Sequence, residues 1–223
     1  MLPSDMVAGI AELVGTEELT LEISGRVPED EARKRVPSEL PLEIHDGGVS
    51  VMVLLFSMRG LHARLTLLPR FNYGEALWRI GVRFHDEPAW FSPACDIDNP
   101  LIRAMGARVV RYPVREARIV LREARGVHAH VDTAEGALTA SATPLTGSLP
   151  PTHPRPQLVG SSGNLFRIPW GEEPAPFRRH ATVSVGDASL AVRTLGGPIR
   201  WDAVGVIHKG RMHHCGPARR VSP

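Results

Sequence analysis

The segment 75–84 alternates between two kinds of side chain, and this alternation constrains the fold more than any other feature. The charged residues Glu75, Arg79 and Arg83 occupy odd-numbered positions, whereas every even-numbered position in the segment is apolar. Successive side chains of a β-strand point to opposite faces, so the pattern predicts a strand with one apolar, buried face. The turn that follows and the apolar segment from Ala89 to Asp96 predict its hairpin partner.

Strand patterns recur along most of the chain. The run Val49 to Met58 is rich in β-branched and apolar residues, as in a strand that is buried on both faces. Further strands are expected at residues 19–24, 116–122, 127–132, 137–142, 180–186, 189–195 and 203–213. Short helices are expected at residues 1–16, after Pro28 and after Asp98-Asn99-Pro100. The chain is therefore predicted to be a single domain over residues 1–223, with an α+β, β-rich fold and one curved antiparallel sheet.

Composition and charge exclude several functional classes. The formal net charge of +2 is too small to indicate a nucleic-acid partner. The longest apolar run, Val51 to Phe56, is much shorter than a membrane-spanning helix. The start of the chain lacks the basic and apolar regions of a secretory signal, so we expect a cytoplasmic protein with no membrane partner. In that compartment Cys95 and Cys215 are expected to be free thiols.

Histidines cluster in two segments. His128 and His130 share one face of a predicted strand, but no further ligand of a metal site is evident beside them. Near the C-terminus, alternation places His208 and His214 on one face of a strand and His213 on the other. Neither pattern supplies a complete ligand set, and the sequence contains no glycine-rich phosphate loop. We therefore expect neither a metal nor a cofactor.

Glu75 is the candidate catalytic residue. One alternative is an ion pair with Arg79 or Arg83 on a solvent-facing strand. The other is a carboxylate held inside a cavity, where burial shifts the pKa and suits the group to acid or base catalysis. The alternation of this strand is compatible with both.

The order and spacing of several short motifs from Gly25 to Ile119 resemble the acetoacetate decarboxylase-like superfamily, and most closely its DUF2071 branch. The motifs are V-P-S-E-L-P-L-E-I at 36–44, D-G-G-V-S-V at 46–51, F-S-M-R-G at 56–60, N-Y-G-E at 72–75, D-I-D-N-P at 96–100 and A-R-V-V-R-Y-P at 107–113. The C-terminal segments I-P-W-G-E-E and A-V-G-V-I-H-K-G-R-M-H-H-C-G are similar to that branch more loosely.

The resemblance implies a sheet that closes into a barrel or cone around a small-molecule cavity, in proteins that are usually oligomers. In the decarboxylases, a lysine after the Tyr-Pro turn forms a Schiff base with a ketone substrate. The positions after Tyr112 and Pro113 are Val114 and Arg115 here, so the resemblance implies that the nucleophile is missing. Glu75 matches the glutamate beside the family's active site.

Neither lysine of the chain, Lys34 or Lys209, lies at a matching position. We therefore predict a protein that binds a small organic acid or ketone and is not a Schiff-base decarboxylase, with Glu75, Arg115 and Tyr112 in its cavity. One alternative is a lyase or hydratase in which Glu75 is the base and Arg115 holds a substrate carboxylate. Another is a structural or partner-binding domain.

Overall fold

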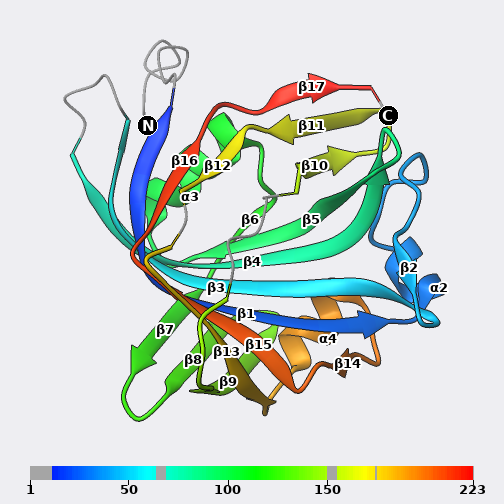
Figure 1. Ribbon diagram of the computed structural model, residues 1–223. Coiled ribbons are helices and arrows are strands. Elements are labelled where there is room, and N and C mark those ends of the chain that lie inside the picture. Colours follow the sequence, from blue (N-terminus) through cyan, green and yellow to red (C-terminus); the bar gives the residue numbers. More distant parts are fainter. Residues whose placement is uncertain (1–11, 64–68, 150–154, 174, 223) are drawn as a thin grey trace.

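The computed structural model describes residues 12–63, 69–149, 155–173 and 175–222. Within these ranges, seventeen strands join in a single hydrogen-bonded sheet (Figure 1). The strands are β1 (Leu13–Val27), β2 (Ile44–His45), β3 (Gly48–Ala63), β4 (Phe71–Phe84), β5 (Glu87–Ile97), β6 (Val114–Glu116), β7 (Arg118–Glu123), β8 (Val127–Thr133), β9 (Gly136–Pro144), β10 (Gln157–Ser161), β11 (Asn164–Ile168), β12 (Trp170–Glu172), β13 (Phe177–Val185), β14 (Arg200–Trp201), β15 (Val204–Lys209), β16 (Arg211–Cys215) and β17 (Arg219–Val221). The helices are α2 (Glu29–Arg33), α3 (Pro100–Met105), the π-helix η1 (Gly106–Val110) and α4 (Ser189–Leu195).

Four long antiparallel strands, β1, β3, β4 and β5, form the centre of the sheet. Both faces of this centre are buried, and each contributes to a separate hydrophobic cluster. We call them the α4 core, which contains Trp78 and Leu190, and the α3 core, which contains Leu77 and Ile102. Because Leu77 and Trp78 are consecutive, the alternation of β4 supplies both cores at once.

The expected β-rich fold with few helices is confirmed, but the sheet is not purely antiparallel. β5 pairs in parallel with both β6 and β10, so the sheet is mixed. A turn and a short helix-containing connection lead from β5 to β6, which allows the parallel arrangement that strand patterns alone did not indicate. The strands expected at residues 116–122, 127–132 and 137–142 are present as β7, β8 and β9, which form an antiparallel meander. Among the described residues, strand pairing does not close the sheet, so the barrel or cone stays a prediction.

The strand expected at residues 189–195 is wrong, because this segment forms helix α4. Leu190, Ala191, Thr194 and Leu195 are buried, a spacing that places them on one face of a helix. In a strand, Leu190 and Val192 would lie on the same buried face, but Val192 is 44% exposed. The segment is too short for its apolar spacing to distinguish the two structures before the packing is known.

The strand expected at residues 203–213 is divided in two. Gly210 has a positive φ of 70° and forms the turn between β15 and β16, a conformation that glycine adopts without steric cost. The helix expected at residues 1–16 lies mostly outside the described residues, and β1 begins at Leu13. No helix in the described ranges is long and apolar enough to span a membrane.

Candidate functional site

A small cavity lies in the α3 core, beside the N-terminal part of β4. Its volume is about 40 Å³, which accommodates water but not an organic ligand. We call it the Glu75 cavity; its lining residues are Leu13, Leu61, Tyr73, Glu75, Ile97, Ile102, Met105, Gly106, Val110, Tyr112, Trp170, His213 and Cys215. Helix α3 and the π-helix therefore provide an apolar wall, and β4 and β16 provide the ionisable groups.

Glu75 is buried, with 5% of its surface exposed, so the solvent-facing ion pair is not what the structure contains. The Cys95 thiol donates a hydrogen bond to its Oε1 at 3.2 Å. Burial raises the pKa of Glu75 to about 7, although Cys95, His213 and Tyr73 act in the opposite direction. A carboxyl with this pKa changes protonation near neutral pH, so it can donate or accept a proton.

Tyr112 lines the same cavity from the turn that follows the π-helix. Its hydroxyl is buried and has no hydrogen-bond partner among the described residues. Buried polar groups are nearly always hydrogen-bonded, because a buried hydroxyl without a partner loses its hydrogen bonds to water and forms none in their place. The Tyr112 hydroxyl is thus a hydrogen-bonding group that this protein keeps available inside the cavity.

A second buried carboxylate, Glu17 on β1, is held by residues of β16. Arg211 donates to its Oε2 from Nε at 2.9 Å and from Nη2 at 2.6 Å, and Thr20 donates to the same oxygen at 2.8 Å. The Nδ1 atom of His213 lies 3.0 Å from Oε1. Burial by itself raises the pKa of Glu17, but His213 and Arg211 outweigh it and lower the pKa to about 2. Glu17 is therefore ionised at neutral pH.

His213 connects this ionised carboxylate to the Glu75 cavity. An Nδ1 atom facing a carboxylate carries the proton, so in the neutral ring Nε2 is an acceptor. The ring of Trp170 meets the His213 ring edge-on, with centroids 4.1 Å apart, and fixes its orientation. The cavity therefore holds two groups suited to proton transfer, Glu75 and His213, that come from different parts of the sequence.

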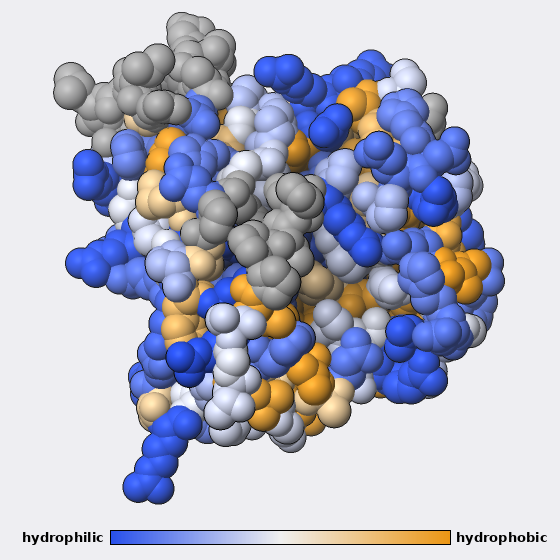
Figure 2. All heavy atoms as spheres, in the orientation of Figure 1, coloured by the Kyte–Doolittle hydropathy of each residue, from blue (hydrophilic) through white to orange (hydrophobic). Residues whose placement is uncertain are grey.

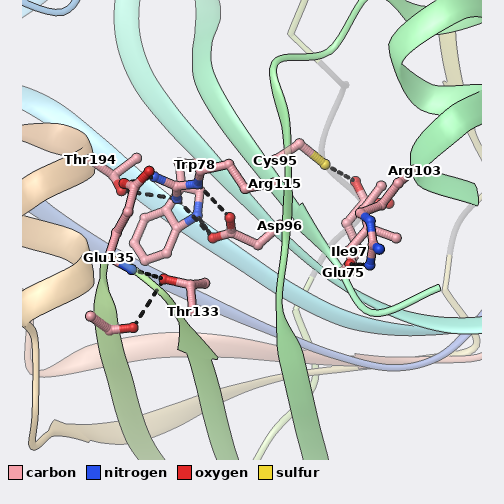
Figure 3. Close-up of polar contacts among 11 residues, drawn as sticks. Glu75, Trp78, Cys95, Asp96, Ile97, Arg103, Arg115, Thr133, Glu135 and Thr194 are labelled. Atoms are coloured by element: carbon pink, nitrogen blue, oxygen red, sulfur yellow. Dashed lines mark hydrogen bonds and ion pairs between the residues drawn. The ribbon is translucent and has the colours of Figure 1, made fainter. Parts of the chain in front are cut away.

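Arg115 lies on the opposite face of the sheet from Glu75 (Figure 3). Its guanidinium binds both oxygens of Asp96, at 2.6 and 2.9 Å, and also contacts Glu135 and Thr194. Trp78 donates from Nε1 to the same Asp96 carboxylate. Cys95 and Asp96 are consecutive in β5, so they point to opposite faces. The structure thus brings Tyr112 together with Glu75 but does not bring Arg115 there.

No lysine lines the cavity in the part of the chain that the structure describes. Lys34 is exposed and pairs with Glu31 at 2.5 Å. Lys209 forms an ion pair with Glu123 and lies over the ring of Phe177. Both lysines of the chain therefore lie outside the lining of the cavity.

The predicted free thiols are confirmed, since Cys95 and Cys215 are both free and buried. On β8, His128 and His130 are exposed, and the apolar residues that alternate with them, Val127, Ala129 and Val131, are buried. Among the described residues, no group of three or more histidine, cysteine, aspartate or glutamate side chains is arranged to hold a metal ion.

Sequence reasoning missed Glu17 and His213. Glu17 occupies an odd-numbered position in β1, and the preceding odd positions, Leu13 and Gly15, are buried. A glutamate on the inward face of a strand is a detectable signal of a buried charge. Its partner could not be identified in the same way, because His213 is 196 residues away in the sequence.

Comparison with solved structures identifies the architecture. An acetoacetate decarboxylase superposes with a TM-score of 0.73 at 17% identity, covering 99% of this chain and 98% of that one. The acetoacetate decarboxylase of Legionella pneumophila gives 0.73 at 12% identity, covering 94% and 87%. The chain has the acetoacetate decarboxylase-like fold. The enduracididine biosynthesis enzyme MppR, complexed with the condensation product of pyruvate and imidazole 4-carboxaldehyde, shares it with a TM-score of 0.72 at 15% identity, covering 95% and 88%.

At these identities the likeness establishes the acetoacetate decarboxylase-like fold and nothing about activity. No family model matches the sequence, and no curated protein matches it. The assignment to the DUF2071 branch therefore stays a prediction.

Proposed function

We propose that this protein binds a small organic acid or ketone in the Glu75 cavity, which widens to admit it, without forming a Schiff base. The observation that carries the proposal is the buried Tyr112 hydroxyl, which has no partner among the described residues and lies in the same cavity as Glu75. Together with a protonated Glu75, it offers two hydrogen-bond donors to a carbonyl or carboxylate oxygen. MppR, which has the same fold, binds a pyruvate condensation product, and this supports a small oxo acid as the ligand class.

The proposed absence of a Schiff base is supported by the residues after the Tyr-Pro turn. By the resemblance to the acetoacetate decarboxylase-like superfamily, Val114 and Arg115 occupy the positions that correspond to the lysine of the decarboxylases. Arg115 is bound to Asp96 behind the sheet, and we propose that it supports the site structurally instead of binding the ligand.

A second candidate function is acid–base catalysis on the same ligand, as in a lyase or hydratase. Two observations favour it: the pKa of about 7 for Glu75, and the orientation of His213 by an ionised Glu17. A carboxylate that fixes a histidine in one tautomer is a common way to prepare a general base. One of the two groups would remove a proton from the ligand and the other would return it.

Binding is tested by titrating pyruvate into the wild-type protein, Glu75→Gln and Tyr112→Phe, with calorimetry as the readout. Both variants are expected to bind about tenfold more weakly. Tyr112→Phe loses its hydroxyl donor, and Glu75→Gln replaces the carboxyl O–H by an amide that donates with different geometry and cannot exchange its proton with the ligand. Glu87→Gln, at the exposed start of β5, removes a carboxylate that does not line the cavity and is the matched control. Equal affinity in all four proteins would refute the site.

Catalysis is tested by following pyruvate and other small oxo acids by proton NMR in deuterated buffer. An acid–base enzyme exchanges the protons next to the carbonyl, and the exchange is expected to disappear in Glu75→Gln and His213→Gln. Lys209→Ala is expected to retain it. Covalent trapping of the ligand on any lysine by borohydride would contradict the absence of a Schiff base.

A further inference from the structure

A large surface groove lies next to the Glu75 cavity and has a positively charged wall. Its volume is about 890 Å³, and it runs along β11, β12, β16 and β17. We call it the arginine groove, because Arg167, Arg219 and Arg220 all line it. Hydrophilic side chains gather over β11 and β17 at the top of Figure 2. The carboxylate of Glu12 also lines the groove, and its Oε1 lies 3.2 Å from Nδ1 of His214.

Two of these arginines face each other directly. In the antiparallel pairing of β11 and β17, Arg167 is opposite Arg219, so the two side chains project from the same face. Like charges at directly opposed positions destabilise a strand pair. Neither arginine side chain forms a hydrogen bond or ion pair within the described parts of the chain. The arrangement costs stability, and a bound anion would offset that cost by contacting both guanidinium groups.

Trp170 forms part of both the arginine groove and the Glu75 cavity. Its ring contacts His213 on the cavity side, and the guanidinium of Arg79 lies 5.3 Å from its centroid. Because the cavity of about 40 Å³ is too small for an organic ligand, one of its walls must move when a ligand enters. Trp170 is the wall that separates the cavity from the adjacent open groove.

We infer that the arginine groove is the anion-binding entrance to the Glu75 cavity, and that Trp170 is the partition between them. This inference rests on the proposed function. It specifies the ligand class as a small anion, such as the carboxylate of an oxo acid, that first binds Arg167 and Arg219. Displacement of the Trp170 side chain then joins the groove to the cavity.

The inference is tested by fluorine NMR of protein labelled with 5-fluorotryptophan. The chain has four tryptophans, and the Trp170 resonance is assigned by its loss in Trp170→Phe. Sulfate and pyruvate are titrated separately at constant ionic strength, so that general screening does not contribute. Three proteins are compared with the wild type: Arg167→Gln/Arg219→Gln, Glu75→Gln, and a control double variant, Arg122→Gln/Arg200→Gln, that removes two exposed arginines outside the groove.

Both anions are expected to shift the Trp170 resonance of the wild type and the control. In Arg167→Gln/Arg219→Gln, both affinities are expected to fall at least about tenfold. Glu75→Gln is expected to bind sulfate normally and pyruvate more weakly. Unchanged affinities in the double arginine variant would refute the proposed role of the arginine groove in anion binding. If Glu75→Gln still weakened pyruvate binding in that case, the proposed function of the Glu75 cavity would stand. If Glu75→Gln bound pyruvate normally while Arg167→Gln/Arg219→Gln bound it weakly, the proposed function of the Glu75 cavity would be refuted. The arginine groove would then be an anion site that does not lead to the cavity.

Discussion

The raised pKa of Glu75 leads to a quantitative prediction about stability and pH. The pKa changes from its ordinary value of 4.5 to about 7 on folding, so over this interval the folded state holds a proton that the unfolded state releases. The contribution of Glu75 to the free energy of unfolding is therefore at its maximum below about pH 4.5. It falls as the pH rises to about 7, and above that it no longer changes. Because each pH unit corresponds to ~1.4 kcal/mol, the total loss is about 3 kcal/mol.

Glu75→Gln removes the ionisation and keeps the shape of the side chain. The free energy of unfolding is measured by urea denaturation of both proteins at about pH 5 and about pH 8. Between these values, the wild type is expected to lose 2 to 3 kcal/mol, as an order of magnitude, relative to the variant. Other ionisable groups are common to both proteins and cancel in this difference, apart from those that interact directly with Glu75.

The control is Glu87→Gln, which tests the effect of removing a glutamate that is not in the cavity. If the difference in unfolding free energy between wild type and Glu75→Gln is the same at both pH values, the carboxyl is not buried as described. The proposed acid–base role would then lose its physical basis.

Three further predictions concern the groups around the site. Arg211→Met is expected to lower the unfolding free energy by about 3 to 5 kcal/mol in urea denaturation, because it leaves the buried Glu17 charge without its main partner; a loss within the range for an exposed arginine would contradict this. Tyr112→Phe is expected to leave stability unchanged or about 1 kcal/mol higher while weakening pyruvate binding, and lower stability would show that the hydroxyl has a structural partner. Arg115→Met is expected to destabilise the fold by about 3 kcal/mol in a urea titration because Asp96 is fully buried, and an unchanged midpoint would refute the supporting role.

Much of the central sheet could be predicted from the sequence, because its strands have alternating or continuously apolar patterns. The two faces of β4 follow the alternation of its sequence, so that Glu75 and Trp78 lie on opposite faces of the strand. Helix α4 could not be predicted, because seven residues contain too few repeats for a period to be identified. The parallel pairing of β5 with β10 depends on contacts between residues far apart in sequence, which local patterns do not encode.

The site was predictable only in part, for a related reason. Glu75 and Tyr112 belong to motifs in one stretch of the chain, and the structure places both in one cavity. The predicted neighbour Arg115 lies behind the sheet because strand parity, not proximity in sequence, determines the face. Glu17 and His213 come from the first and the sixteenth strand, and their contact exists only after the chain has folded.

The adjacency of Cys95 and Asp96 has a consequence for how accurately the cavity is built. A strand that slips by one residue exchanges its two faces, so a slip of β5 would bring Asp96 into the cavity and remove the thiol from Glu75. The contacts of Asp96 with Trp78 and Arg115, on β4 and β6, oppose that slip from both neighbouring strands. The ion pair between Asp96 and Arg115 therefore fixes the register of β5, and in this way it positions Cys95 against Glu75, a residue that the ion pair itself does not contact.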